Sequence, residues 1–313
     1  MNVAAHESRD PVNTGNPVST GAGNARSARD LVPVLGRFFP APAAAKVPEI
    51  IALFWVVKIL TTAGGEVTSD YLKIYGNFGG GGAEVAMFVV GVVLQFATRR
   101  YRALAYWFLA YAIATAGTGI SDFLHLDVHI PYLGTTVLWT LILLAVFRTW
   151  YRSEGTLSIH SIRTQRREGF YWATVFVTFA LGTALGDFTA NSLNMGYLVS
   201  AVFFLGLILL PAIAWRWFGL NSVVAFWLAY IVTRPLGASI SDWISKPPHL
   251  TGIGFGNGQT AIVFGVATVL LVVYLAIRQP DIQQEPGSIV AVDNGSAVRF
   301  PDDRSDTPEV GVG

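Results

Sequence analysis

The sequence predicts an all-α, polytopic membrane protein with about eight transmembrane helices, built from four parallel two-helix repeats. Hydrophobic residues occupy 52% of the 313 positions and charged residues only 13%, which is too little charge for the surface of a water-soluble protein. Apolar segments long enough to cross a bilayer follow one another along the chain. One motif also recurs four times with constant internal spacing.

The apolar segments lie between two polar tails. A hydrocarbon layer of roughly 30 Å requires about 17–25 residues of helix. Backbone groups in lipid must be hydrogen-bonded within the segment, and barrel strands would be shorter and alternate in polarity, so we expect helices. The predicted helices cover residues 48–72, 78–98, 103–124, 130–149, 169–190, 195–215, 221–243 and 256–277.

Composition divides the chain into five parts. The first part is rich in Ala, Gly, Pro, Ser and Asn and the last is acidic, so both are predicted to be disordered cytoplasmic tails. Between them, a basic cytoplasmic loop separates two membrane halves of four helices each. The parts are the tail 1–45, the half 46–150, the loop 151–168, the half 169–278 and the tail 279–313.

A tryptophan, a glycine and an aspartate recur at fixed spacing in every odd-numbered predicted helix. The glycine follows the tryptophan by ten residues and the aspartate follows it by fifteen. The four sets are Trp55, Gly65 and Asp70; Trp107, Gly117 and Asp122; Trp172, Gly182 and Asp187; and Trp227, Gly237 and Asp242. Tryptophan occupies only 9 positions in the chain, so coincidence does not explain four such sets. The unit is a helix hairpin used four times.

The repeat also predicts how the copies are arranged. Each copy holds two helices, so every copy enters the membrane in the same direction and the repeats are parallel. At 1.5 Å per residue, the aspartates lie about 26–33 Å from the cytoplasmic entry, and we expect all four at one depth near the outer boundary. We expect the glycines to allow close helix packing and the tryptophans to form an aromatic belt at the cytoplasmic interface.

Three stretches carry a resemblance to a known family. They are residues 46–62, which begin KVPEI and end FWVVKILTT, residues 185–190 (LGDFTA) and residues 233–239 (TRPLGAS). They resemble a bacterial family of uncharacterised multi-pass membrane-anchored proteins, whose members are sometimes labelled predicted regulators of amylopullulanase. The resemblance covers residues 46–278. It implies a polytopic inner-membrane protein and brings no established activity to this chain.

The four aspartates are the leading candidate site. An aspartate at a helix C-terminus opposes the helix macrodipole, so these positions are not routine caps. If the repeats pack around a common axis, the four carboxylates converge on one outward-facing funnel that forms an ion or substrate pathway. They are Asp70, Asp122, Asp187 and Asp242. The alternative is that each is a solvated carboxylate at the membrane interface.

Glu66 distinguishes the first repeat from the others. It forms an i, i+4 strip with Lys58, Thr62 and Asp70 on one helix. The equivalent positions in the other copies are Thr118, Thr183 and Ala238. Carboxylate oxygens suit hard divalent cations or a proton relay, so Asp70 and Glu66 are the predicted metal ligands and a divalent cation is the predicted cofactor.

Lys58 and Arg234 are the two basic residues that we place inside the bilayer. Burying either one unpaired costs about 2.5–3.5 kcal/mol, so we expect each to have an acidic or carbonyl partner. One interpretation is a structural ion pair within the bundle. The other is a tethered counter-ion on the substrate pathway, which an incoming substrate displaces.

These features favour a transporter or permeation protein for a small cation, either a divalent metal or a proton-coupled solute. The alternative is a non-transporting, membrane-anchored scaffold or regulatory protein. We expect no enzyme activity because no nucleophile and base occur together. The near balance of 21 basic and 20 acidic residues argues against a nucleic-acid partner, which leaves the lipid bilayer and a small cation as expected partners.

The basic residues predict the orientation. One set of loops and helix ends carries Arg99, Arg100, Arg102, Arg148, Arg152, Arg163, Arg166, Arg167, Arg216 and Arg278. The opposite loops hold only Lys73 and Lys246. By the positive-inside rule, we expect a bacterial inner-membrane protein with both termini in the cytoplasm.

Reporter fusions test this orientation. Green fluorescent protein fused after Gly155 is expected to fluoresce, because the arginines place that loop in the cytoplasm. Alkaline phosphatase fused after Asn77 or Pro248 is expected to be active, because both positions face outside. A cytoplasmic signal at Asn77 would overturn the topology.

Overall fold

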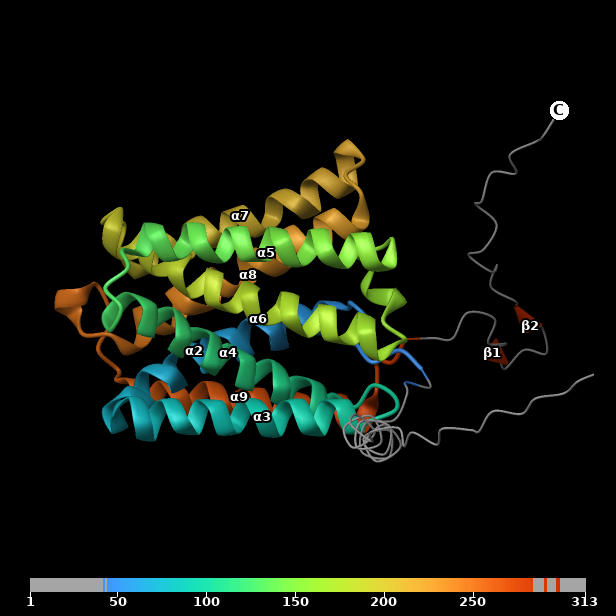
Figure 1. Cartoon of the computed structure of the whole chain (residues 1–313), viewed down its shortest axis with the longest axis horizontal. Helices are drawn as coiled ribbons and strands as arrows, with labels where there is room; N and C mark the ends of the chain where they lie inside the picture. The colour runs from blue at the N-terminus through green and yellow to red at the C-terminus, as the bar shows by residue number, and fades with distance from the viewer. Residues whose placement is uncertain (1–41, 43, 284–289, 292–296, 299–313) are drawn as a thin grey trace, which may run out of the picture. The chain divides into compact units, whose positions relative to one another are not determined.

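The computed structural model describes residues 42, 44–283, 290–291 and 297–298, and these residues hold eight long helices (Figure 1). The helices are α2 (Ala52–Leu72), α3 (Gly82–Ala97), α4 (Ala103–Leu126), α5 (Tyr132–Glu154), α6 (Gln165–Asp187), α7 (Gly196–Phe218), α8 (Ser222–Ser245) and α9 (Asn257–Arg278). The predicted disorder of most of the two tails, residues 1–41 and nearly all of 284–313, lies outside the described residues.

Short elements connect or follow these helices. The 3₁₀ turns are η1 (Lys73–Tyr75), η3 (Ile159–Ser161) and η5 (Pro248–Leu250), and the π-helical turns are η2 (Asn77–Gly81) and η4 (Phe188–Ser192). A two-residue strand pair, β1 (Val290–Ala291) and β2 (Ala297–Val298), is antiparallel. The architecture is therefore all-helical in the membrane part, as the sequence predicts.

Seven of the eight helices, some extended by an adjoining turn, are long and apolar enough to cross a membrane. The exception is α2, which carries Lys58, Glu66 and Asp70. Its 21 residues nevertheless span about 31 Å, and these three side chains are buried against other helices. The predicted polytopic fold is confirmed, and α2 is the helix whose buried stretch carries Lys58, Glu66 and Asp70.

The basic loop is shorter than the predicted 151–168 because the flanking helices extend into it. Helix α5 continues to Glu154 and ends where Gly155 adopts φ 71° and donates its N–H to the Tyr151 carbonyl. Helix α6 begins at Gln165, where the Thr164 hydroxyl caps the N–H of Arg167. Only residues 155–164 remain between the two helices.

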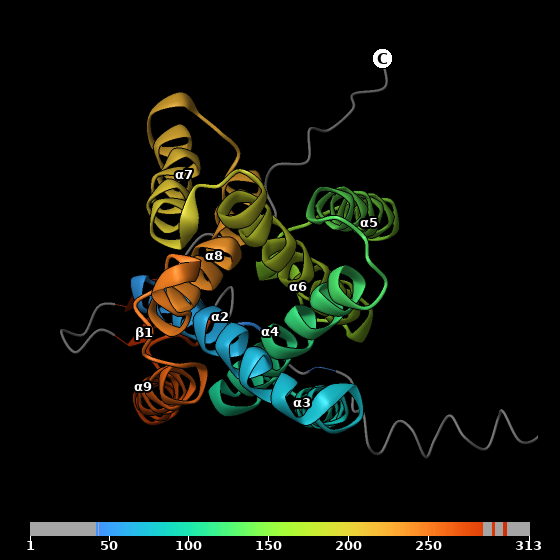
Figure 2. The ribbon, with the colours of Figure 1, turned by 90° about the vertical axis from the view of Figure 1, so that its left-hand side faces the viewer.

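Four helices form a closed inner ring. Viewed along the helices, α2, α4, α6 and α8 surround one axis, and α3, α5, α7 and α9 lie outside them (Figure 2). Each inner helix packs against the next, and α8 packs against α2 to close the ring. The repeats are thus related by approximate fourfold rotation, which is the parallel arrangement that the sequence predicts.

Each outer helix packs on the inner helix of the following repeat. The pairs are α3 on α4, α5 on α6, α7 on α8 and α9 on α2. In an apolar 18-residue stretch of α4, α6 and α8, 56–72% of the residues are buried. In the corresponding stretch of each of the four outer helices, 22% of the residues are buried. The outer helices therefore face lipid, and the polar residues of the motif are left to the ring.

The repeated glycines set the spacing of the ring. A methyl group on Gly65 would overlap Ala114, one on Gly182 would overlap Arg234, and one on Gly237 would overlap Thr62. On Gly117 it would lie 3.0 Å from the Phe179 Cβ. The residues that they meet all lie eight positions before the motif aspartate of the next repeat. The predicted packing role is confirmed, and the contacts follow the same cyclic order as the helices.

The repeated tryptophans form a second cyclic set of contacts. Each one lies against the aromatic residue that precedes the tryptophan of the preceding repeat. The ring centroids are 5.5 Å apart for Phe54 and Trp107, 5.1 Å for Tyr106 and Trp172, 6.1 Å for Tyr171 and Trp227, and 5.9 Å for Phe226 and Trp55. We call these eight residues the aromatic layer.

The predicted lipid-facing aromatic belt is therefore wrong for three of the four tryptophans. Trp107, Trp172 and Trp227 are no more than 5% exposed, and only Trp55 is partly exposed. Their position on the inner helices turns them toward neighbouring helices, where they gain ring contacts and lose contact with headgroups. The aromatic layer lies in the first turns of the inner helices, at the end of the ring where the arginines lie.

A substitution at Gly65 tests the packing of the ring. Valine at this position would overlap α4, and overpacking of this kind costs about 1–3 kcal/mol. We expect Gly65→Val to lower the melting temperature of the detergent-solubilised protein. Gly206→Val is the matched control, because no atom lies within 4 Å of a side chain at that position in α7. Equal losses in both variants would contradict the packing argument.

Candidate functional site

A buried ion pair between α2 and α8 lies inside the ring, one helical turn from the motif aspartate of α2. Arg234 Nη2 donates to Glu66 Oε2 at 2.6 Å, and the two side chains are 0% and 4% exposed. The same nitrogen donates to Thr118 Oγ1 at 2.5 Å and to Thr183 Oγ1 at 2.8 Å. Each inner helix therefore contributes one side chain to a single polar cluster, which we call the central cluster.

The repeat explains how the central cluster is assembled. Thr118 and Thr183 occupy the positions equivalent to Glu66, and their hydroxyls lie 2.9 and 3.2 Å from Glu66 Oε2. In the fourth copy the equivalent residue is Ala238, and Arg234 comes from one turn earlier on the same helix. The predicted acidic partner of Arg234 is confirmed as Glu66.

Lys58 has a different environment from the one that we predicted. Its side chain is buried, and among the described residues its Nζ has no hydrogen-bond partner. The ammonium position instead lies 3.7 Å from the centroid of the Tyr230 ring and 4.2 Å from that of Phe179. The expected acidic or carbonyl partner is therefore wrong for Lys58, and two aromatic faces take its place.

The four motif aspartates lie at the far end of the ring from the aromatic layer, each in the last turns of an inner helix. Lys73 joins Asp70 and Asp122, with Nζ to oxygen distances of 2.5 Å to each. Lys246 contacts Asp70 and lies 3.9 Å from Asp242. Two lysines therefore link three aspartates from three helices, and we call the four aspartates and two lysines the aspartate layer.

Asp187 is the fourth member of the aspartate layer and differs from the rest. It is only partly buried and accepts from the Asn191 amide at 3.3 Å. It interacts electrostatically with Asp122 and Asp242, and among the described residues no lysine or arginine forms an ion pair with it. The expected gathering of the four carboxylates at one end is confirmed. Asp70, Asp122 and Asp242 are buried, unlike solvated carboxylates at a membrane interface.

The lysines of this layer keep their charge. Burial alone would lower the pKa of Lys73, but Asp70 and Asp122 raise it well above its usual value. Burial likewise opposes the charge of Lys246, and Asp242 and Asp70 raise its pKa. Both side chains therefore stay protonated at neutral pH, and they offset the unfavourable placing of carboxylates at helix C-termini.

Glu66 and Asp70 do not form a joint metal site in this arrangement. Glu66 pairs with Arg234, and Asp70 pairs with both lysines. No group of three or more His, Asp or Glu residues is placed to hold a metal ion in the part of the chain that the structure describes. The predicted divalent cation stays a prediction, and protein cations occupy the carboxylates that we assigned to it.

Several residues beside the site had no predicted role in it. Lys73 and Lys246 indicated only orientation, although their spacings of three and four residues from Asp70 and Asp242 predict contact. Glu84 of α3 is buried, accepts from Ser69 at 2.6 Å and lies where a side chain on Gly119 would otherwise stand. An acid within an otherwise apolar segment was the signal for Glu84.

A second buried ion pair lies near the opposite end of the ring. Lys46 Nζ is 2.7 Å from Glu168 Oε2, and Gln95 donates to the other carboxylate oxygen at 2.9 Å. Lys46 is the first residue of the stretch that begins KVPEI, and the sequence predicts no partner for it. This pair ties the segment before α2 to α6 and α3, and nothing in the local sequence of Lys46 indicates its partner.

Removing one partner of the central ion pair tests how much the pair contributes to the stability of the fold. Glu66→Gln leaves Arg234 buried without a counter-charge, and breaking a buried pair in this way costs about 3–5 kcal/mol. We expect a large fall in melting temperature. The double variant Glu66→Leu with Arg234→Leu removes both charges and is expected to recover most of the loss. A double variant less stable than Glu66→Gln would contradict this account.

Comparison with known proteins supports the hairpin as the repeat unit. A family model described as Repeat of Unknown Function (DUF347) matches three times, at residues 105–156, 170–220 and 225–280. Each match begins two residues before a motif tryptophan and covers one helix pair, α4 with α5, α6 with α7, or α8 with α9. No curated protein and no solved structure matches the chain.

The first hairpin, α2 with α3, lies outside the three matches but carries the same motif and completes the same ring. It is also the hairpin that supplies Glu66, Lys58 and Glu84. The matches together cover just over half of the 313 residues, so the chain belongs to the DUF347 repeat family.

Proposed function

We propose that the protein carries a small cation across the membrane along the axis of the inner ring, with the aspartate layer as its outward-facing entrance. The observation that carries this proposal is the position of the central cluster. A carboxylate held by an arginine lies buried inside a ring of long helices, one helical turn from a layer of four further carboxylates. Ionisable groups at such depth are costly and are typical of ion and proton pathways.

A proton suits these carboxylates better than a divalent metal ion. The three most buried aspartates and Glu66 each have a lysine or arginine close by, whereas a divalent ion needs several free oxygen ligands. Protonation of Glu66 removes its charge and releases its hold on Arg234. Thr118 and Thr183 then remain as partners of the guanidinium. The proposal is therefore a proton carrier in which Arg234 exchanges partners.

The same geometry suggests the gates. The aromatic layer closes the arginine end of the ring, and the lysine bridges of the aspartate layer narrow the other end. Transport then requires that Lys73 or Lys246 release an aspartate and that the aromatic layer open. Lys73, with 39% of its side chain exposed, is the more accessible of the two lysines.

A second candidate function is a membrane-anchored scaffold or regulator. The close glycine contacts and the interlocked outer helices favour it, because they make the ring rigid. In that case the central cluster serves only to fix the register of the four inner helices. A measurement of ion flux distinguishes the two functions, because a scaffold moves no ions across the membrane.

Flux through reconstituted protein tests the proposal. Liposomes containing the wild-type protein and an internal pH dye are exposed to an imposed proton gradient, with parallel arms for Na⁺, K⁺ and Mn²⁺. We expect faster proton entry than in empty liposomes, and loss of at least tenfold in Glu66→Gln. Asp187→Asn disturbs no ion pair with a described residue, and it is expected to slow entry less because it removes one charge from the entrance.

Asp127→Asn is the matched control, because Asp127 is an exposed loop carboxylate bonded to Asn77 and lies outside the ring. Its flux is expected to equal that of wild type. Glu66→Asp keeps a carboxylate at this position, so it distinguishes loss of the carboxylate from a folding defect in Glu66→Gln. If wild-type and empty liposomes pass all four cations equally, transport is excluded and the scaffold function stands.

A further inference from the structure

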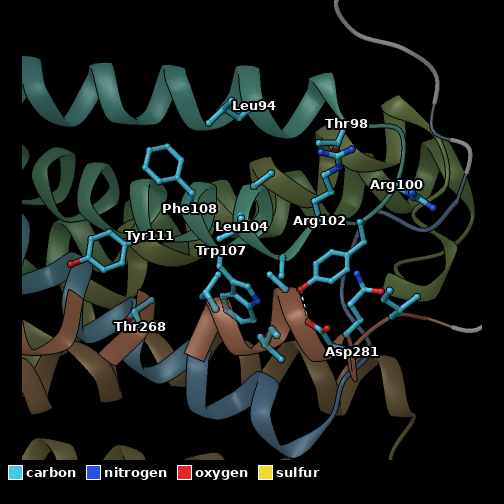
Figure 3. Close-up of a pocket in the computed structure, with 18 of the residues that line it drawn as sticks. Leu94, Thr98, Arg100, Arg102, Leu104, Trp107, Phe108, Tyr111, Thr268 and Asp281 are labelled. Carbon is cyan, nitrogen blue, oxygen red and sulfur yellow. Dashed lines mark hydrogen bonds between the residues drawn. The ribbon is translucent and has the colours of Figure 1, made fainter. Parts of the chain in front are cut away.

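A large groove opens between α3 and α9, with α4 as its floor (Figure 3). Its volume is about 1170 Å³, above the range of about 300–1,000 Å³ that is typical of small-molecule sites. The walls are mostly apolar and include exposed Leu94, Leu104 and Phe108. Because the outer helices face lipid, the apolar part of this groove is open to the hydrocarbon of the bilayer.

The length of the groove matches one leaflet of the bilayer. Along α3 it extends from Met87 to Thr98 and along α9 from Gly265 to Gln279, which correspond to about 16 and 21 Å of helix. Half of a bilayer is about 20–22 Å thick with its headgroups. The groove therefore extends from the headgroup level at the arginine end to about the middle of the membrane.

The mouth of the groove is basic. Arg100 and Arg102 line it, both are exposed, and neither has an ion-pair partner among the described residues. Asp281 is the one acid lining the groove. It is buried and its Oδ2 accepts from the Tyr101 hydroxyl at 2.5 Å, whereas both arginines are exposed at the surface. An anion therefore meets two exposed guanidinium groups that have no ion-pair partner in the part of the chain that the structure describes.

We propose that this groove is a binding site for one anionic phospholipid of the leaflet at the arginine end. The acyl chains lie against α3, α4 and α9, and the phosphate lies at Arg100 and Arg102. The apolar length, the free arginines and the location at headgroup level all fit this occupant. The chain's own tails fit less well, because their polar and acidic composition does not suit a groove at hydrocarbon depth.

Lipid binding to the purified full chain tests the proposal. Native mass spectrometry of delipidated protein, titrated with phosphatidylglycerol or phosphatidylcholine, measures how tightly each lipid is held. We expect one phosphatidylglycerol per chain, bound at least tenfold more tightly than phosphatidylcholine, because each arginine near an anionic headgroup contributes about fivefold. Inorganic phosphate at the same concentration is expected to leave the bound lipid in place, which distinguishes the headgroup from free phosphate.

Three variants locate the site. Arg100→Gln with Arg102→Gln is expected to weaken phosphatidylglycerol binding about tenfold or more, and Leu104→Trp is expected to block the groove. Arg148→Gln with Arg152→Gln is the matched control, because these exposed arginines lie at the same end on α5, outside the groove. Equal binding of the two lipids, or equal weakening in both arginine double variants, would overturn the proposal in favour of non-specific attraction.

Discussion

The close approach of the four inner helices is the constraint on which the rest of the structure depends. The motif glycine of each inner helix lies against a residue of the next inner helix, so the two helices pack closely at that position. Only at this separation does one guanidinium nitrogen of Arg234 reach a carboxylate on α2 and hydroxyls on α4 and α6. The central cluster stabilises the ring in turn, because an ion pair in an apolar interior cannot be separated cheaply.

The three levels of the ring differ in how far they depart from symmetry. The aromatic layer is nearly fourfold, with an aromatic pair at each helix contact. The aspartate layer keeps four carboxylates but only two lysines, which leaves Asp187 apart from the bridges. The central cluster is the least symmetric, with Glu66, two threonines and an arginine displaced by one turn. Asymmetry is therefore concentrated where the proposed chemistry takes place, and symmetry where packing alone is required.

The motif made the fold predictable. The partners that individual charges find on distant parts of the chain were not predictable. Spacing alone placed the four aspartates at one end and the glycines at helix contacts, because both follow from helical geometry. Which helix lies beside which depends on the exchange of outer helices between repeats, and no local pattern states it. For the same reason the pairing of Lys46 with Glu168, 122 residues away, was not predictable. Lys58 was mispredicted because aromatic faces were not considered as partners for a cation.

The exchange of outer helices has a consequence for how the protein is made. Among the helices that the structure describes, α9 is the last to leave the ribosome, yet it packs on α2, the first of them. Until α9 is inserted, one side of α2 is exposed to lipid, although α8 already closes the inner ring against α2. The complete fold can therefore form only after the whole membrane part has been synthesised, and a chain truncated before α9 cannot adopt it. A closed circle also fixes the copy number, because a fifth hairpin would have no gap to enter, unlike the open-ended growth of solenoid repeats.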